Sequence, residues 1–272
     1  MDARPIGLFD SGLGGLTAAR ALEELLPGEN LIYFGDSANA PYGVRSLPDL
    51  ERLARANAAF LLRYDVKAIL VACGTVSSTV LPSVRPACPV PMFDVVRPAC
   101  ARAAEAGFRR IAVAATEATI RSGAFDRQLR MECPGLQVFS KACQSLVVTV
   151  EQGHFRPGDK AAEAAVAAEL EPVRAFGPQA VLLACTHFPL LQDQISAFLG
   201  DGVELISVGM EAARALRDYL QQNDLLAPRS RGEHRWFTSG SARDFGVLAE
   251  VFLGHSVRAE HARALSAGDC DG

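Results

Sequence analysis

Short apolar runs alternate with longer amphipathic stretches along the whole chain. Most of the runs have the length of a strand and are apolar throughout, which is typical of strands buried on both faces of a parallel sheet. The stretches between them are long enough for helices that would cover those faces. Nine strands are predicted, at residues 6–9, 31–34, 68–72, 90–93, 111–114, 136–139, 180–184, 203–206 and 236–238.

Two of the intervening stretches carry clear helix signals. Residues 48–63 open with a proline and place apolar residues at helical spacing. Residues 159–175 are rich in alanine and follow Pro157-Gly158-Asp159, a combination that favours a helix start. The alternation of strands and helices predicts an α/β fold.

An internal repeat divides the strands into two sets. Ala68-Ile-Leu-Val-Ala-Cys73 and Ala180-Val-Leu-Leu-Ala-Cys185 share one strand pattern, the same Ala-Cys ending and a polar step after it. The copies lie too far apart for a solenoid repeat, so we expect two pseudo-symmetric flavodoxin-like domains, each a mostly parallel sheet flanked by helices. The predicted first domain comprises residues 1–97 and 208–272, because the last segment is too short for a core of its own. The second comprises residues 98–207.

Composition and charge exclude several classes of protein. Hydrophobic residues make up 49% of the 272 residues, enough for buried cores, and the formal net charge of -4 argues against a nucleic-acid partner. The apolar runs are far shorter than the roughly 20 residues that cross a bilayer. No basic and then apolar leader follows Met1. We therefore expect a cytoplasmic protein that does not contact membranes.

Two of the cysteines stand out from the other five. The seven cysteines are odd in number and include no C-x-x-C pair, which predicts neither a disulfide framework nor a metal site. A lone cysteine at a strand end is usually an inert core residue. Cys73 and Cys185 occur in repeated motifs, which favours a functional interpretation for this pair.

The unusual residues follow the carboxyl ends of predicted strands, where ligands bind in open α/β sheets. The small-residue turn Asp10-Ser11-Gly12-Leu13-Gly14-Gly15 follows the first strand, and Cys73 and Cys185 end the third and seventh. If the halves face each other, two thiols meet across one cleft. One could remove a proton from a carbon while the other delivers a proton to the opposite face, which inverts a stereocentre.

Each thiol needs an orienting group. Asp10 is the candidate beside Cys73, and His187 with Glu151 are the candidates beside Cys185. No cofactor is expected: the turn after the first strand lacks the G-x-G-x-x-G spacing of a dinucleotide site. None of the three lysines, Lys67, Lys141 and Lys160, is placed like the anchor of pyridoxal phosphate.

Four motifs in order resemble glutamate racemase. They are Gly7-Leu8-Phe9-Asp10-Ser11-Gly12-Leu13-Gly14-Gly15, then Tyr33-Phe34-Gly35-Asp36 with Ala40-Pro41-Tyr42-Gly43, then Ala72-Cys73 with Thr75, and Ala184-Cys185-Thr186-His187-Phe188-Pro189-Leu190. The resemblance implies a cofactor-independent enzyme that interconverts L- and D-glutamate, supplies the D-isomer for peptidoglycan and forms a homodimer.

The resemblance also implies the site residues. Cys73 and Cys185 would be the catalytic pair, assisted by Asp10, Glu151 and His187. The substrate would lie among Asp10, Ser11, Pro41, Tyr42, Gly43, Gly74, Thr75, Thr116, Thr119, Thr186 and His187.

The chain departs from the family pattern in four places. Gly74 stands where the family usually has asparagine, which removes one side-chain donor and acceptor, and Asp94 is a candidate replacement. Gln144 stands where proline is common. Residues 91–97 carry an unexpected charge pair, and Ser207-Val208-Gly209 replaces the usual Asp-Ser-Gly. The loss of one hydrogen bond costs about 0.5 to 1.5 kcal/mol and would shift binding without removing the bases.

Three other functions remain open on the sequence. Gly74 motivates a racemase for aspartate or another small amino acid. A non-catalytic binding protein could keep the same fold. His187 close after Cys185 could also belong to a Cys/His acyl hydrolase, although that function leaves the Cys73 motif unexplained.

Overall fold

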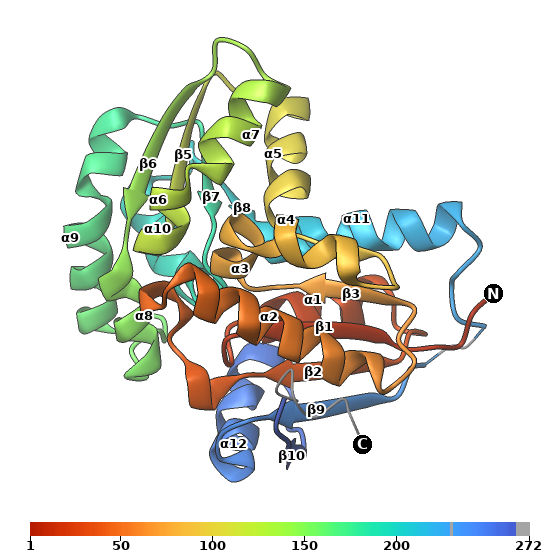
Figure 1. Ribbon diagram of the computed structural model, residues 1–272. Helices are drawn as coiled ribbons and strands as arrows, with labels where there is room; N and C mark the ends of the chain where they lie inside the picture. Colours follow the sequence, from red (N-terminus) through yellow and green to blue (C-terminus); the bar gives the residue numbers. More distant parts are fainter. Residues whose placement is uncertain (229–230, 265–272) are drawn as a thin grey trace.

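Two parallel sheets, one in each lobe, organise the structure (Figure 1). The computed structural model describes residues 1–228 and 231–264. None of the helices in these ranges combines the length and the apolar content that crossing a membrane requires.

Within the described residues, the first sheet has six strands in the order β10-β9-β2-β1-β3-β4, and every neighbouring pair is parallel. Its central strands are buried along their whole length, as their apolar runs predict. The strands are β1 (Ile6–Asp10), β2 (Leu31–Gly35), β3 (Ala68–Val71), β4 (Met92–Phe93), β9 (His234–Thr238) and β10 (Ala259–His261).

The second sheet has the order β6-β5-β7-β8 in the described chain and is also parallel. Its strands are β5 (Arg110–Ala115), β6 (Gln137–Ala142), β7 (Ala180–Leu183) and β8 (Glu204–Ser207). The order repeats that of β2-β1-β3-β4 in the first sheet, so β3 and β7 occupy equivalent places. The predicted fold class, two pseudo-symmetric sheets flanked by helices, is confirmed.

Both helices with clear sequence signals form. In α2 (Leu47–Leu62), the hydroxyl of Ser46 accepts a hydrogen bond from the backbone N–H of Asp49 and so caps the first turn. In α9 (Lys160–Phe176), the carboxylate of Asp159 accepts from the N–H groups of Ala161 and Ala162. Gly177 ends α9 at a φ of 66°, a left-handed conformation that glycine adopts at little cost.

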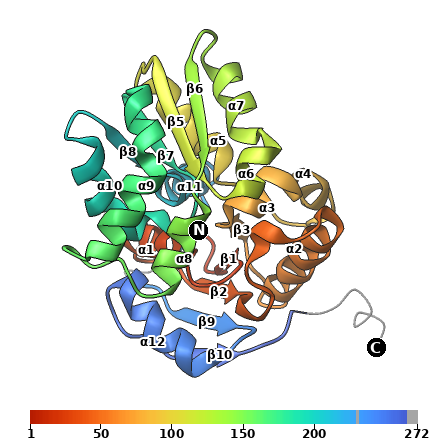
Figure 2. The same cartoon turned by 90° about the vertical axis from the view of Figure 1, so that its left-hand side faces the viewer.

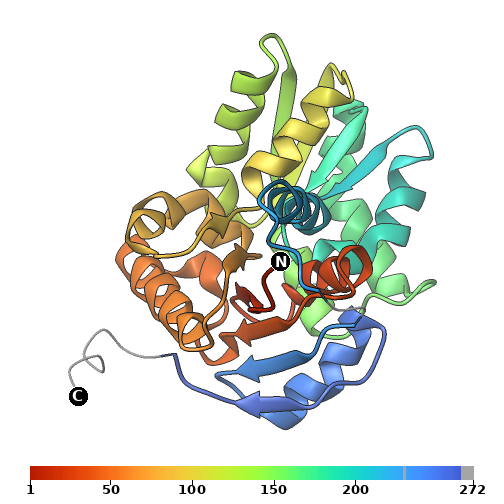
Figure 3. The ribbon, with the colours of Figure 1, turned by 90° about the vertical axis from the view of Figure 1, so that its right-hand side faces the viewer.

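The other helices lie around the two sheets (Figures 2 and 3). They are α1 (Leu16–Leu25), α3 (Gly74–Thr79), α4 (Leu81–Val84), α5 (Val96–Glu105), α6 (Glu117–Ser122), α7 (Ala124–Glu132), α8 (Gln144–Glu151), α10 (Gln192–Leu199), α11 (Val208–Gln222) and α12 (Ala242–Leu253). Short 3-10 turns are η1 (Ser37–Asn39), η2 (Tyr42–Val44), η3 (Arg85–Ala87) and η4 (Phe188–Leu191).

The C-terminal segment extends the first sheet. β9 pairs with β2 from Leu31 to Gly35, and β10 then adds the outer strand (blue in Figure 1). β10 is an additional strand beyond the nine predicted.

The helix α11 packs against both α1 and α5, so it contacts helices of both lobes. The domain limits at residues 97 and 207 stay a prediction.

Candidate active site

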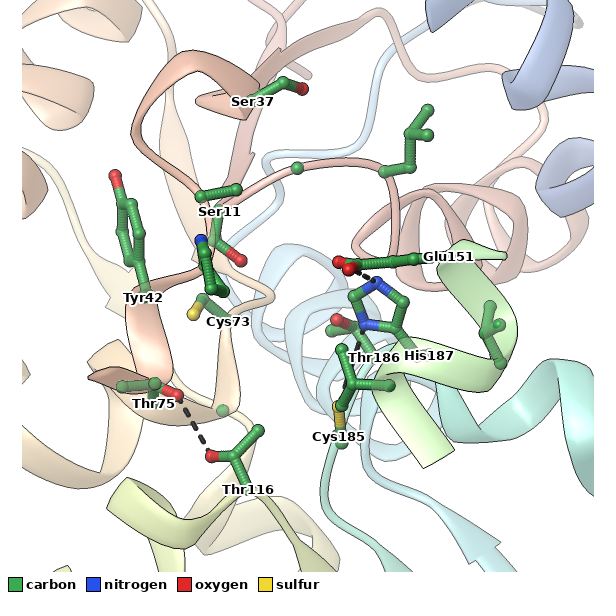
Figure 4. Close-up of a pocket in the computed structure, with 18 of the residues that line it drawn as sticks. Ser11, Ser37, Tyr42, Cys73, Thr75, Thr116, Glu151, Cys185, Thr186 and His187 are labelled. Atoms are coloured by element: carbon green, nitrogen blue, oxygen red, sulfur yellow. Dashed lines mark hydrogen bonds and ion pairs between the residues drawn. The ribbon is translucent and has the colours of Figure 1, made fainter. Parts of the chain in front are cut away.

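One cavity of about 320 Å³ opens where the carboxyl ends of the two sheets face each other. Both lobes contribute to its wall, and Cys73 and Cys185 lie on opposite sides of it (Figure 4). Because β3 and β7 are equivalent strands, the two thiols reach the cavity from equivalent positions.

Cys73 follows β3 and occupies the cap position of α3. Its side chain is buried. Burial and the nearby negative charge of Asp10 raise the pKa of the Cys73 thiol far above its usual range, although the backbone N–H groups of Val76 and Thr75 oppose the shift. Without a ligand, Cys73 is therefore a protonated thiol at neutral pH.

Cys185 has a different electrostatic environment. Its sulfur lies 3.7 Å from Nδ1 of His187, and Nε2 of His187 lies 3.5 Å from a carboxylate oxygen of Glu151. Burial alone would lower the pKa of His187, but the contacts with Cys185 and Glu151 and the charge of Asp10 raise it to about 10. The imidazole is thus a cation at neutral pH, and it can stabilise a thiolate on Cys185.

Asp10 lies beneath the cavity and links the two lobes. Its Oδ2 accepts hydrogen bonds from the backbone N–H of Gly15 at 2.8 Å and from the hydroxyl of Thr186 at 3.5 Å. Its other carboxylate oxygen is buried and has no hydrogen-bond partner among the described residues. Asp10 is fully buried and does not line the cavity itself.

A chain of threonine hydroxyls joins the lobes on another side of the cavity. Oγ1 of Thr75 and Oγ1 of Thr116 are 3.2 Å apart, and Thr116 donates to Thr119 at 3.0 Å. Thr116 is the cap of α6 and follows β5, just as Ser11 follows the equivalent strand β1. The hydrogen bond between Thr75 and Thr116 is shown in Figure 4.

Two glycines of the first lobe face the segment that carries Cys185. A Cβ atom at Gly74 would lie 2.6 Å from the backbone oxygen of Ala184, and one at Gly14 would overlap the side chain of Thr186. No side chain fits at position 74 unless this backbone moves. Gly74 therefore does more than omit a hydrogen-bonding group, because it also lets the ends of β3 and β7 approach closely.

Comparison with known proteins decides the family. The sequence profile of the Asp/Glu/Hydantoin racemase family matches residues 15–216, most of the chain. The chain belongs to this family. It is 36% identical to glutamate racemase of Limosilactobacillus reuteri over 253 residues, which cover 93% of this chain and 94% of that protein. Glutamate racemase of Corynebacterium diphtheriae is 39% identical over 259 residues, 94% of this chain and 97% of its own.

Solved structures of the family agree with the fold. The crystal structure of glutamate racemase from Francisella tularensis in complex with D-glutamate superposes with a TM-score of 0.88 at 32% identity. The match covers 99% of this chain and all of that one. The resemblance to glutamate racemase that the four motifs indicated is confirmed.

The structure gathers nearly all residues that the racemase resemblance implied. Asp10 and Thr119 are the exceptions, since they lie behind the wall and contact lining residues. The functional role of each residue stays a prediction. The implied residues that line the cavity are Ser11, Pro41, Tyr42, Gly43, Cys73, Gly74, Thr75, Thr116, Glu151, Cys185, Thr186 and His187.

Tyr42 lines the cavity, but its hydroxyl already has two partners in the protein. It donates to Asp36 at 2.6 Å and accepts from the side-chain amide of Asn57 at 2.9 Å. Asp36 also accepts from Ser239 at 2.6 Å, so this buried network ties the Tyr42 turn to the end of β9. Tyr42 can therefore border a substrate through its ring and its backbone.

Sequence reasoning missed an apolar part of the wall and one amide. The apolar part comes from α8 and α12, which have no motif and show only ordinary helical spacing. The amide belongs to Gln144, which was noted only as a departure from the family pattern. The lining residues missed from helices are Gln144, Val147, Val150, Leu248, Val251 and Phe252.

Asp94 does not replace a side chain at position 74. Its carboxylate receives a hydrogen bond from Arg85 at 2.6 Å and caps α5 through the backbone N–H groups of Val96 and Arg97. It is absent from the wall of the cavity. Of the two charged residues in this run, Asp94 thus has a structural role at the start of α5 and pairs with Arg85, which lies outside the run.

Proposed function

We propose that this chain interconverts L- and D-glutamate without a cofactor, with Cys73 and Cys185 as the two acid/base groups. Two cysteines on opposite walls of one cavity support this mechanism. The similarity over almost the full length to proteins named glutamate racemase supports the substrate.

In the proposed reaction, a cysteine thiolate takes the α-proton of the bound amino acid. The electron pair of that C–H bond is left on the α-carbon, which becomes planar and is stabilised by the adjacent carboxylate. The opposite cysteine thiol then donates its proton to the other face. One thiolate has become a thiol and one thiol a thiolate, so the products differ from the reactants only in configuration and in the site of the proton.

The resting protein supports a definite starting state. Cys73 is a protonated thiol, and Cys185 lies beside the cationic His187. From this contact we propose that Cys185 acts as the base and Cys73 as the acid for one enantiomer. The reverse reaction requires the other distribution of the proton, with Cys73 as the thiolate and Cys185 as the thiol.

The proposed biological role is to supply D-glutamate for peptidoglycan, and the proposed assembly is a homodimer. No nucleic acid or membrane takes part in this proposal. Sedimentation velocity of the purified chain tests the assembly: a dimer is expected at micromolar concentration, and a monomer at all concentrations would contradict it.

The reaction itself is tested by NMR of L- and D-glutamate in deuterated water, together with circular dichroism. We expect the α-proton signal to disappear and the optical activity to decay from both enantiomers without added cofactor. Cys73→Ala and Cys185→Ala should each lower the racemisation rate by about a hundredfold to ten-thousandfold, because each removes an acid/base group. Full activity in both variants would refute the mechanism.

A second candidate function differs only in substrate. Gly74 changes the wall beside Cys73, so aspartate or another small amino acid could be the better substrate. The same exchange experiment on a panel of amino acids tests this. A higher kcat/KM for aspartate than for glutamate would favour the alternative. Saturable binding with no α-proton exchange would indicate a binding protein, and a thioester adduct at Cys185 would indicate an acyl hydrolase.

A further inference from the structure

The cavity offers an acidic amino acid no cationic lysine or arginine. Among the residues that the structure describes, neither type lines the wall, and the His187 cation is already held by Glu151 and Cys185. A substrate with two carboxylates must therefore be held by neutral donors, namely hydroxyls, backbone N–H groups and side-chain amides. Each free neutral donor then carries a large share of the binding.

Most polar side chains of the wall are already engaged in the protein. Thr75 and Thr116 contact each other, Thr186 contacts Asp10, and Tyr42 contacts Asp36. The hydroxyl of Ser37 accepts a hydrogen bond from Thr238. Two lining side chains, Ser11 and Gln144, have no hydrogen-bond partner in the described part of the chain. Ser11 is already an implied substrate residue, but Gln144 is not.

Gln144 is well placed to contact a ligand. It is the first residue of α8, in the second lobe, and it is half-buried. Its side-chain oxygen lies 3.7 Å from the position that a Cβ atom of Gly43 would take, and Thr116 is a neighbour at the same point. The oxygen of its amide therefore lies close to Gly43 of the first lobe. Rotation of the amide group would present either its two N–H donors or its oxygen.

The first lobe has no side chain of its own at position 74. Gly74 lines the same cavity, and the backbone oxygen of Ala184 prevents any side chain there. Gln144 is the one side-chain amide among the described lining residues. Recognition of the substrate by a side-chain amide must therefore come from the second lobe.

We propose that Gln144 is a specificity-determining residue whose side-chain amide donates hydrogen bonds to a carboxylate of the substrate. This inference rests on the proposed function, because it takes an acidic amino acid as the ligand. Gln144 supplies a neutral hydrogen-bond donor in place of a lysine or arginine cation.

The test compares Gln144→Met with Gln152→Met. Methionine keeps the length and helix propensity of glutamine but has no N–H donor. Gln152 lies at the exposed end of the same helix and does not line the cavity, so it is a matched control. We expect KM for glutamate to rise about 10- to 100-fold in Gln144→Met with kcat changed little, because a hydrogen bond to a charged group is lost from both ground and transition states.

Gln144→Glu gives an independent arm. The new carboxylate would repel the substrate carboxylate, so KM should rise at least as much as in Gln144→Met, while circular dichroism shows an unchanged fold. An unchanged KM in both Gln144 variants would overturn the inference. A fall in kcat with unchanged KM would overturn it too, because Gln144 would then act on the cysteines and not on binding.

Calorimetric titration with glutamate separates this inference from the proposed function. If the wild-type chain binds glutamate without exchanging its α-proton, and Gln144→Met binds it at least 10-fold more weakly, the racemase function fails while the role of Gln144 stands. If the wild-type chain racemises glutamate and Gln144→Met binds it equally well, the function stands and the role of Gln144 fails.

Discussion

His187 gives two cysteines in equivalent positions different electrostatic surroundings. It lies against Cys185 and Glu151, while Cys73 has Asp10 as its charged neighbour. The pKa of His187 is raised from 6.5 to about 10, so the cation is present below that pH and is lost as the pH rises through it. The ion pair of His187 with Glu151 therefore contributes fully to the stability of the fold below pH 6.5. This contribution declines as the pH rises toward 10.

Glu151→Gln should move the alkaline limit of activity to lower pH. The neutral amide no longer favours the imidazolium, so the pKa of His187 falls and the cation beside Cys185 is lost earlier. The measurement is kcat/KM for both enantiomers between pH 6 and 11, with Gln152→Met as the control. An alkaline limb at the wild-type position would contradict the role given to Glu151.

Gly74→Ala should lower both stability and activity. The added methyl group would meet the backbone oxygen of Ala184, so the fold loses about 1 to 3 kcal/mol of stability. A displacement of about 1 Å of the segment that carries Cys185 lowers kcat by about a hundredfold.

Gly202→Ala is the control for this substitution, because a Cβ atom there would meet nothing within 4 Å. Urea unfolding and initial rates measure both effects. A Gly74→Ala protein with wild-type kcat and stability would show that the two strand ends are free to separate.

At the scale of elements, a buried ion pair stabilises the end of the first sheet that lies away from the cavity. Nζ of Lys67 lies 2.5 Å from a carboxylate oxygen of Glu29 and donates to the backbone oxygens of Asp2 and Leu225. Glu29 in turn accepts from the backbone N–H of Ala227. This pair therefore joins the N-terminus, the start of β3 and the connection from α11 to β9.

Lys67→Met should destabilise the fold by about 3 to 5 kcal/mol, because it leaves the buried carboxylate of Glu29 without its cation. Arg20→Ala, which breaks an exposed pair with Glu24, should cost less than about 1 kcal/mol. Both values come from urea unfolding followed by circular dichroism. Equal effects in the two variants would mean that the buried pair has no special role.

The strands that the sequence predicted most clearly are apolar runs that are buried along their whole length. The run Ala68–Val71 is apolar and buried throughout, so β3 was evident. The outer strand β10 was missed because Ala259–His261 has no apolar run and is largely exposed. β4 is shorter than its predicted range 90–93, and Pro91 has no backbone N–H to donate to a neighbouring strand.

The candidate site divides in the same way. Ser11 and Cys73 were found because they follow the carboxyl ends of predicted strands, where ligands bind, and because they belong to motifs that resemble glutamate racemase. Val150 and Phe252 were missed because apolar residues at helical spacing are expected in any core, and only the tertiary packing decides which of them face a cavity. Phe252 even contacts the ring of His187, at a centroid distance of 6.5 Å.

At the scale of the whole molecule, the C-terminal segment is part of the first lobe and of the cavity. β9 covers one edge of β2, and Trp236 and Phe237 are buried against Tyr33 and Phe60. Leu248, from α12, contributes to the wall. The wall of the cavity is therefore complete only when the C-terminal segment has paired with the first sheet.

A chain that ends at Asp224 should neither fold cooperatively nor racemise glutamate. It would leave the edge of β2 unpaired and expose the apolar surface that β9 and α12 cover, which favours aggregation. Solubility, thermal unfolding and α-proton exchange of the truncated and full chains measure this. A soluble, cooperatively folded truncated chain would show that β2, β1, β3 and β4 suffice for the first sheet.

The unequal surroundings of the two cysteines have a thermodynamic limit. Enantiomers have the same free energy in water, so a racemase at equilibrium must give equal amounts of both. By the Haldane relationship, kcat/KM must then be equal in the two directions, whatever His187 and Asp10 do to their neighbours. The asymmetry can appear only as a larger kcat matched by a larger KM for one enantiomer. Turnover number and apparent affinity can therefore differ between L- and D-glutamate, while catalytic efficiency cannot.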